Sequence, residues 1–84
     1  MQALREQGFI FQIWPNDHNP PHTHVFKAGT EVEIYLGDGT ACPNVKKIKK
    51  MENRDVIKAL PLTAENQQVL LEKWRSIHGN EQND

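Results

Sequence analysis

Apolar and polar residues alternate most regularly in TEVEIYLG, at residues 30–37. Val32, Ile34 and Leu36 share one parity of this stretch, which is typical of an antiparallel strand with one buried face. Two more strands are expected before it, at residues 8–14 and within 22–29, and a fourth is expected at residues 40–48. Because Pro43 cannot donate a hydrogen bond to a neighbouring strand, the fourth strand should lie at a sheet edge or contain a bulge.

Turn-forming residues separate these strands. Ala28-Gly29-Thr30 forms a short connection, and Asp38-Gly39 is a strong signal for a tight turn. The segment PNDHNPP, at residues 15–21, cannot be helical, because residues before proline favour extended geometry and Asn-Asp favours turns. We therefore expect an irregular, proline-stiffened loop between the first two strands.

The C-terminal half carries two helical patterns. Asn53 is expected to cap the first helix, RDVIKAL, and Pro61 should break or kink it. Thr63 is expected to cap the second helix, and Gly79 supplies the left-handed residue that ends it. One apolar stripe runs along the second helix and consists of Leu70, Leu71, Trp74 and Ile77. Such a stripe packs against the apolar face of a sheet.

These patterns predict an α+β fold, a three- to four-stranded antiparallel meander packed by one or two C-terminal helices. Residues 1–79 would form a single domain with Trp74 as its main core anchor. The polar end of the chain, HGNEQND, has no apolar residue, so residues 80–84 are expected to form a disordered tail.

The composition narrows the class of protein. A chain of 84 residues has room for one core, and a net charge of -1 argues against a generic nucleic-acid binder. The lone Cys42 excludes an internal disulfide, fits a reducing compartment, and is expected to be a small buried residue. No apolar run reaches the roughly 20 residues that span a bilayer, and we see no secretion signal. We therefore expect a cytoplasmic protein without membrane contact.

The segment WPNDHNPPHTHV, at residues 14–25, holds three of the four histidines. His22 and His24 point the same way if they lie on a strand, and Asp17 and His18 could return to them across the loop. Zinc or another divalent transition metal held by His18, His22 and His24 is one hypothesis. A metal-free cluster in which His22 and His24 act as catalytic acid and base is another, and a purely structural loop is the third. The residues alone leave all three open.

A second candidate site is the basic segment NVKKIKKMENR. Clustered lysines can hold phosphate without sequence preference, although a solvated strand end would look the same. Tyr35 could stack on a base or be an ordinary strand residue. The candidate binding residues are Asp17, His18, Lys46, Lys47, Lys49, Lys50 and Arg54. The only serine, Ser76, falls inside a predicted helix, which excludes a hydrolase of the serine-triad type.

The segment GFIFQIWPNDHNPPHTHV, together with NQQVLLEKWRSIHG, resembles a small bacterial family, the domain of unknown function numbered 4160. Members of that family carry an NDHxPPHxHV-like core and close on a helix with a Leu-Leu-x-x-Trp pattern. The similarity spans about residues 8–79, and the positions that match the family core are Asp17, His18, His22 and His24. The chain departs from the family at Pro61, which interrupts what in many relatives looks like one longer helix.

The resemblance implies a component of a toxin–antitoxin-like two-gene module, since genes of the family are often described in that way. We therefore expect a small interaction or regulatory protein that binds a protein partner encoded nearby, through a strand edge or a helix face. The alternative is an RNA-binding or RNA-cleaving protein that uses the histidines and lysines. A homodimer is also a candidate assembly.

Overall fold

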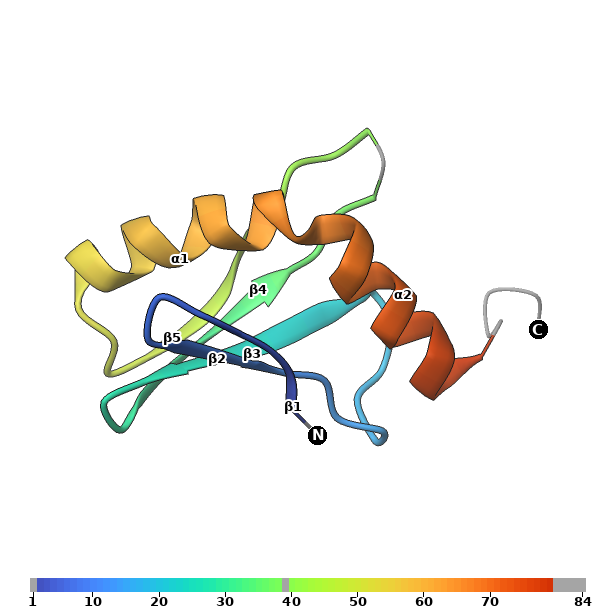
Figure 1. The fold of residues 1–84 in the computed structure, drawn as a ribbon, viewed down its shortest axis with the longest axis horizontal. Helices are drawn as coiled ribbons and strands as arrows, with labels where there is room; N and C mark the ends of the chain where they lie inside the picture. Colours follow the sequence, from blue (N-terminus) through green and yellow to red (C-terminus); the bar gives the residue numbers. More distant parts are fainter. Residues whose placement is uncertain (1, 39, 80–84) are drawn as a thin grey trace.

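The computed structural model describes residues 2–38 and 40–79, which form a five-stranded sheet and two helices (Figure 1). The predicted α+β class is confirmed, with one or two strands more than expected. The predicted tail at residues 80–84 lies outside the described residues. The strands are β1 (Gln2–Glu6), β2 (Phe9–Gln12), β3 (His22–Lys27), β4 (Thr30–Tyr35) and β5 (Asn44–Lys49). The helices are α1 (Asn53–Glu65) and α2 (Gln67–His78).

The sheet is an antiparallel meander in which strands pair in the order β1-β2-β3-β4-β5. The hydrophobic pattern does not predict β1, because its sequence, QALRE, has no clear alternation and ends on two charged residues. The available signal is the turn after it, where Gln7 and Gly8 have φ values of 50° and 85°, as a two-residue hairpin turn requires. Sequence reasoning overlooked this turn because its first position holds glutamine rather than asparagine or glycine.

The connection between β4 and β5 is longer than the tight turn expected at Asp38-Gly39. Tyr35 pairs with Asn44, so residues 36–43 connect the two strands. The Asp38 carboxylate accepts hydrogen bonds from the backbone N–H groups two and three residues further on, at 2.8 and 2.9 Å. Gly39 itself lies outside the described residues. The acid therefore organises a wider loop instead of a two-residue turn.

Cys42 lies in this connection and is exposed, so the prediction of a buried cysteine was wrong. Strand pairing begins only at Asn44, which leaves Cys42 outside the sheet and away from the core. The expected edge position of the last strand is confirmed, since β5 pairs with β4 alone and Pro43 immediately precedes it. A register shift opposite Glu33 also puts a bulge in this strand pair.

Helix α1 continues through Pro61, so the expected break there and the separate helix starting at Thr63 are both wrong. The missing N–H of Pro61 leaves the carbonyl of Ile57 without its helical donor. Pro61 is exposed and the Ile57 side chain is 68% exposed, so water can replace the lost bond on this side of the helix. Thr63 is buried within α1, where its hydroxyl donates to the carbonyl of Ala59 at 2.8 Å.

The helix ends follow other signals than those expected. Asn53 is the first residue of α1 rather than its cap, and Glu52 takes the N-cap position without a side-chain hydrogen bond. The two helices are separated at Asn66, and Gly79, with φ of 67°, ends α2 as predicted. In the described part of the chain, no helix has the length and apolar content needed to cross a bilayer.

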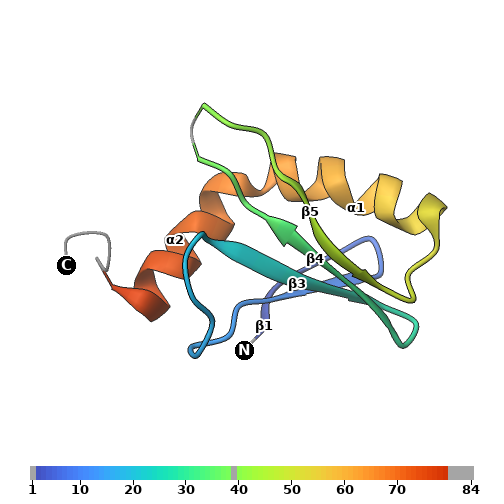
Figure 2. The ribbon, with the colours of Figure 1, turned by 180° about the vertical axis from the view of Figure 1, so that it is seen from behind.

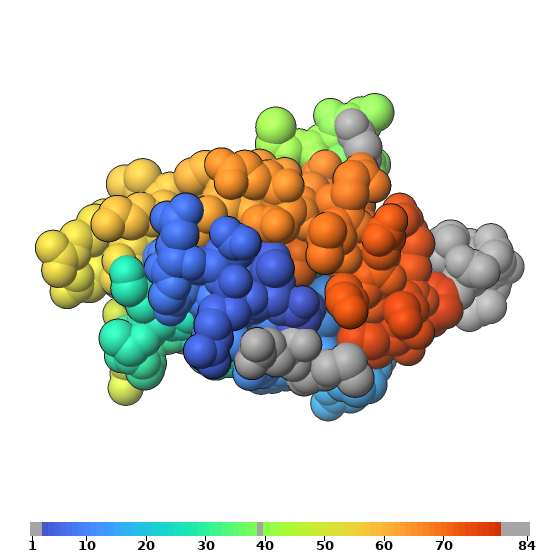
Figure 3. Space-filling view, in the orientation of Figure 1, coloured from blue at the N-terminus to red at the C-terminus, as the bar shows by residue number. Residues whose placement is uncertain are grey.

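The core lies between one face of the sheet and the two helices (Figures 1 and 2). The two helices and the hairpin formed by β1 and β2 lie side by side on the molecular surface in Figure 3. The strands and the residues that directly follow β2 and β4 contribute Phe9, Phe11, Ile13, Val25, Val32, Ile34 and Leu36. The helices contribute Val56, Ala59, Leu62, Leu70, Leu71 and Trp74. Trp74, the predicted anchor, is 3% exposed. The stripe read from the sequence is therefore the face that α2 buries.

Replacing Trp74 with alanine should lower the free energy of unfolding by about 3–5 kcal/mol, because it removes a buried indole and leaves a cavity. The matched control is Val69→Ala on the same helix, at a side chain that is 43% exposed. This control should change stability by less than about 0.5 kcal/mol. Urea denaturation followed by circular dichroism measures both, and equal effects would contradict the core position of Trp74.

Candidate functional site

The histidines of β3 lie on the sheet face opposite the apolar core. His22 and His24 share this face because side chains two residues apart on a strand point the same way. The register with β4 places Tyr35 opposite His22 and Glu33 opposite His24. Strand periodicity and register thus bring two imidazoles and a carboxylate together without any contribution from loops.

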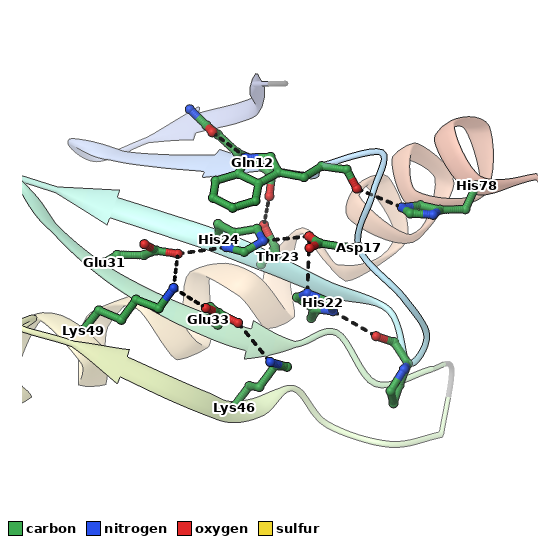
Figure 4. Close-up of polar contacts among 12 residues, drawn as sticks. Gln12, Asp17, His22, Thr23, His24, Glu31, Glu33, Lys46, Lys49 and His78 are labelled. Atoms are coloured by element: carbon green, nitrogen blue, oxygen red, sulfur yellow. Dashed lines mark hydrogen bonds and ion pairs between the residues drawn. The ribbon is translucent and has the colours of Figure 1, made fainter.

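Asp17 reaches the same place from the loop between β2 and β3 (Figure 4). Its backbone N–H donates to the carbonyl of Trp14 at 3.2 Å, which closes a turn with Pro15 at the second position. Proline favours that position because its ring fixes φ near the value the turn needs. The turn carries the Asp17 carboxylate to the two imidazoles.

One oxygen of Asp17 faces the Nε2 atom of each of the two histidines. The Oδ2 atom lies 2.7 Å from His24 Nε2 and 3.3 Å from His22 Nε2. The Asp17 side chain is 17% exposed, and the two imidazoles are 6% and 4% exposed. One carboxylate and two imidazoles at these distances form a candidate ligand set for a divalent metal ion.

The remaining ring nitrogens have partners of their own. His22 Nδ1 donates to the carbonyl of Pro20 at 3.0 Å, so in a neutral ring its Nε2 carries the lone pair. His24 Nδ1 lies 2.8 Å from Oε2 of Glu31. Histidines that bind metals commonly donate their second N–H to a backbone carbonyl or a carboxylate, which fixes the orientation of the ring. Both histidines have such an outer partner.

Aromatic rings hold the histidines from the sides. Trp14 stacks on His24, with ring centroids 3.6 Å apart and planes inclined by 15°. The ring of His22 lies 5.4 Å from that of Trp74 on α2. His78, one turn further along α2, stacks on Trp74 at 3.8 Å, and its Nε2 lies 3.1 Å from the carbonyl of Trp14. The last turns of α2 therefore contact both sides of the site.

Glu33 forms a second charged group beside the histidines. Its carboxylate oxygens bind Lys46 at 3.0 Å and Lys49 at 2.7 Å. Burial raises the pKa of the Glu33 carboxyl, but hydrogen bonds and charges from Lys49 and Lys46 outweigh this effect and lower the pKa from 4.5 to about 2. The hydrogen bonds to Glu33 also raise the pKa of both lysines. The two lysines therefore more than balance the charge of Glu33, and Lys49 also lies 3.7 Å from Glu31.

The structure brings together some of the predicted site residues and separates others. Asp17, His22, His24, Lys46 and Lys49 line one depression of about 420 Å³, which we call the histidine hollow. His18 lines it too but is exposed, and it does not join the ligand group found among the described residues.

The predicted basic segment does not form one patch. Lys50 and Arg54 line a different depression near the start of α1, together with the acids Glu52 and Asp55. Lys47 is exposed on β5. The bulge in β5 and the positive φ of Lys50, 72°, turn neighbouring basic side chains in different directions.

Sequence reasoning missed four residues of this site: Trp14, Glu31, Glu33 and His78. The signal for the two glutamates was present, because they share the polar parity of β4 and that strand pairs with β3. His78 falls four residues after Trp74, on the apolar stripe of α2, which is the signal that could have placed it against the core. For the stacking of Trp14 on His24 the chain offers no local signal.

A second depression adjoins the first. This helix hollow, as we call it, has a volume of about 640 Å³ and shares Asn19, Pro20 and Tyr35 with the histidine hollow. Its other walls include Leu71, Trp74 and Arg75 of α2. The proline-rich loop is therefore a common rim of two hollows of different character, one lined by charged groups and one by apolar groups.

Glu33→Gln should remove a contribution to stability that depends on pH. The folded-state pKa of about 2 lies below the ordinary 4.5, so the ion pairs stabilise the fold above pH 4.5 and this contribution is lost as the pH falls towards 2. Between about pH 5 and pH 2 the wild-type protein should lose roughly 1–3 kcal/mol more stability than the variant. Chemical denaturation at each pH measures the difference, and parallel profiles would contradict the role of Glu33.

Comparison with known proteins agrees with the resemblance carried by the NDHNPPHTHV core. No curated protein and no solved structure matches the chain. A family model, described as Domain of unknown function (DUF4160), matches residues 8–75, which is most of the chain and includes Asp17, His22 and His24. The chain therefore belongs to the family Domain of unknown function (DUF4160).

Proposed function

We propose that this domain binds a divalent transition-metal ion through Asp17, His22 and His24. The observation that carries the proposal is the convergence of two Nε2 atoms on one carboxylate oxygen, at 2.7 and 3.3 Å. Three ligands of these types occur in catalytic zinc sites and in non-haem iron sites, where the remaining coordination positions stay open. The proposed site is therefore of the open kind.

The distances from Asp17 to the two histidines are close to those that an ion requires. Bonds of about 2.0–2.2 Å in tetrahedral geometry hold ligand atoms about 3.3–3.6 Å apart. The pair formed by His22 and Asp17 already has this spacing, whereas the pair formed by His24 and Asp17, at 2.7 Å, has to widen by roughly 0.6 Å or more. Asp17 lies on a loop, so rotation of its carboxylate supplies the movement.

The hydrogen bonds of the two rings leave room for a cation beside Asp17. His24 faces carboxylates at both nitrogens, and a neutral imidazole can donate to only one of them. His22 already donates from Nδ1 to Pro20, so the lone pair of its Nε2 also faces Asp17. Without a metal ion, each Nε2 atom would need a proton of its own to bond to Asp17. One metal ion beside Asp17 satisfies both Nε2 atoms at once.

A second group of candidate ligand atoms in the described residues consists of His24, Glu31 and Glu33. Its carboxylates already have cationic partners, since Lys49 lies 2.7 Å from Glu33 and 3.7 Å from Glu31, and Lys46 binds the other oxygen of Glu33. We therefore assign the ion to the first group. The role of Glu31 is then to orient His24 from outside, as a carboxylate does for many metal-bound imidazoles.

The protein, freed of metal with a chelator, should bind one equivalent of zinc or cobalt(II), as measured by titration calorimetry and elemental analysis. His22→Ala and His24→Ala should each lower the affinity by more than about 100-fold, because each removes a ligand. Glu31→Gln should lower it by about 10–100-fold, because it weakens the outer hydrogen bond.

The matched control is His18→Ala, which removes a nearby imidazole that is exposed and lies outside the ligand group. Its metal affinity should equal that of the unchanged protein. Binding that survives loss of both strand histidines, or that depends on His18, would contradict the proposed ligands. Circular dichroism of each variant verifies that the fold is retained.

At the level of the whole protein, we propose a small interaction or regulatory protein, a component of a toxin–antitoxin-like two-gene module that binds a protein partner. The helix hollow supports this proposal. It combines the stiff rim of Pro20 and Pro21 with aromatic walls from Tyr35 and Trp74. Concave sites of this kind accept the anchoring side chains of partner proteins.

Arg75→Glu should weaken co-purification with the product of the adjacent gene by at least tenfold, because Arg75 lines the helix hollow and is exposed. The control is Arg54→Glu, an exposed position on α1 outside this hollow. Co-expression with pull-down measures both variants. Equal capture by both would contradict the proposed surface, and sedimentation of the protein alone shows whether a second copy occupies it instead.

RNA binding or cleavage is the less favoured proposal. The phosphate contacts would have to come from the lysines of β5, yet Lys46 and Lys49 bind the buried Glu33. Lys50 lines a separate depression that also contains acids. A phosphate backbone needs a continuous basic track, which these lysines do not provide. In that proposal His22 and His24 would transfer protons or hold the metal ion.

A further inference from the structure

The histidine hollow extends beyond the three proposed metal ligands. Its volume of about 420 Å³ falls in the range of small-molecule sites. Hydrogen-bond donors make up much of the remaining lining, namely Asn16, Asn19, Tyr35, Lys46 and Lys49. An open coordination position beside such donors suits a ligand that brings acceptor oxygens.

Metal binding reverses the net charge of this region. Three carboxylates lie in or beside the hollow, from Asp17, Glu31 and Glu33, and two ammonium groups accompany them. With neutral imidazoles the group has one net negative charge, and a divalent ion changes it to one net positive charge. The metal-free hollow therefore repels anions and the metal-loaded hollow attracts them.

Lys46 is the cation best able to contact such an anion. Its side chain is 34% exposed, while the carboxylate it binds, Glu33, is 7% exposed. Lys49 stays on the other oxygen of Glu33 at 2.7 Å, so Lys46 can turn towards a ligand without leaving that buried carboxylate unpaired. A charge-assisted hydrogen bond from Lys46 to an oxyanion then replaces the bond that Lys46 gives up to Glu33.

We propose, on the basis of the metal site described above, that the histidine hollow binds a small ligand bearing a phosphate or carboxylate group. One oxygen of this group takes an open position on the metal ion held by Asp17, His22 and His24. A second oxygen accepts a hydrogen bond from Lys46. Anion binding at this site therefore requires the metal.

The test uses the cobalt(II)-loaded protein, whose visible absorption bands report changes in coordination. Titrations with inorganic phosphate and, separately, with acetate should each be followed for a saturable spectral change, and the tighter of the two anions identifies the preferred group. Calorimetry of the metal-free protein with the same anion should show affinity at least tenfold lower. Equal anion affinity with and without cobalt would overturn the proposal.

Two variants isolate the contribution of the lysine. Lys46→Met should weaken anion binding to the cobalt form five- to tenfold without weakening cobalt binding, because Lys46 is not a ligand of the metal and repels it. The control, Lys47→Met, removes an exposed lysine of the same strand and should bind the anion as tightly as the unchanged protein. Equal anion affinity of the two variants would overturn the role of Lys46.

Failure of this inference can be told apart from failure of the metal site. If cobalt binds with the predicted dependence on His22 and His24 but neither anion changes its spectrum, the metal site stands and the anion site is wrong. If cobalt does not bind at all, both are wrong. Retained circular dichroism in every variant excludes unfolding as the cause of a loss.

Discussion

One oxygen of Asp17 lies between the Nε2 atoms of His22 and His24, and the arrangement of this sheet face depends on that contact. To make it, the loop between β2 and β3 has to fold back over β3. The same loop supplies the Trp14 ring that covers one imidazole and the Pro20 carbonyl that orients the other. A shift of β3 by one residue would turn both imidazoles to the opposite face, so the site and the strand register are specified together.

The core and the site share side chains rather than lying in separate regions. Trp74 belongs to the apolar core and also contacts His22, while His78 joins Trp74 to the carbonyl of Trp14. In a domain this small, few residues can be used for stability alone. The last turns of α2 therefore serve both purposes, because they complete the core and also contact the His22 ring and the backbone of Trp14.

Much of the fold could be predicted because it rests on local patterns. Strand alternation gave β3 and β4, and helical spacing gave the buried stripe around Trp74. The prediction of a break at Pro61 was wrong because the lost hydrogen bond lies on the solvent side of α1, where water can replace it. The local sequence does not show which side of the helix is exposed. In the site, periodicity put His22 and His24 on one face. Asp17 was expected to return across the loop, and the local turn at Pro15 brings it there. The contribution of Glu31 depends on strand register, which is a property of tertiary structure.

The charges of this face favour the proposed metal site over the proposed RNA site. A polyanion such as RNA needs a continuous track of cations, yet Lys49 has to stay on the buried Glu33 if Lys46 turns away, and the surplus charge near the histidines is negative. A divalent cation is the partner that such a surplus attracts. The histidine hollow also shares Pro20 and Tyr35 with the helix hollow. If metal, anion and protein partner bind as proposed, the small ligands and the partner contact opposite sides of one rim. Any change that the small ligands cause in this rim then alters the affinity for the partner. The partner must alter the affinity for the small ligands by the same factor, because such coupling is reciprocal.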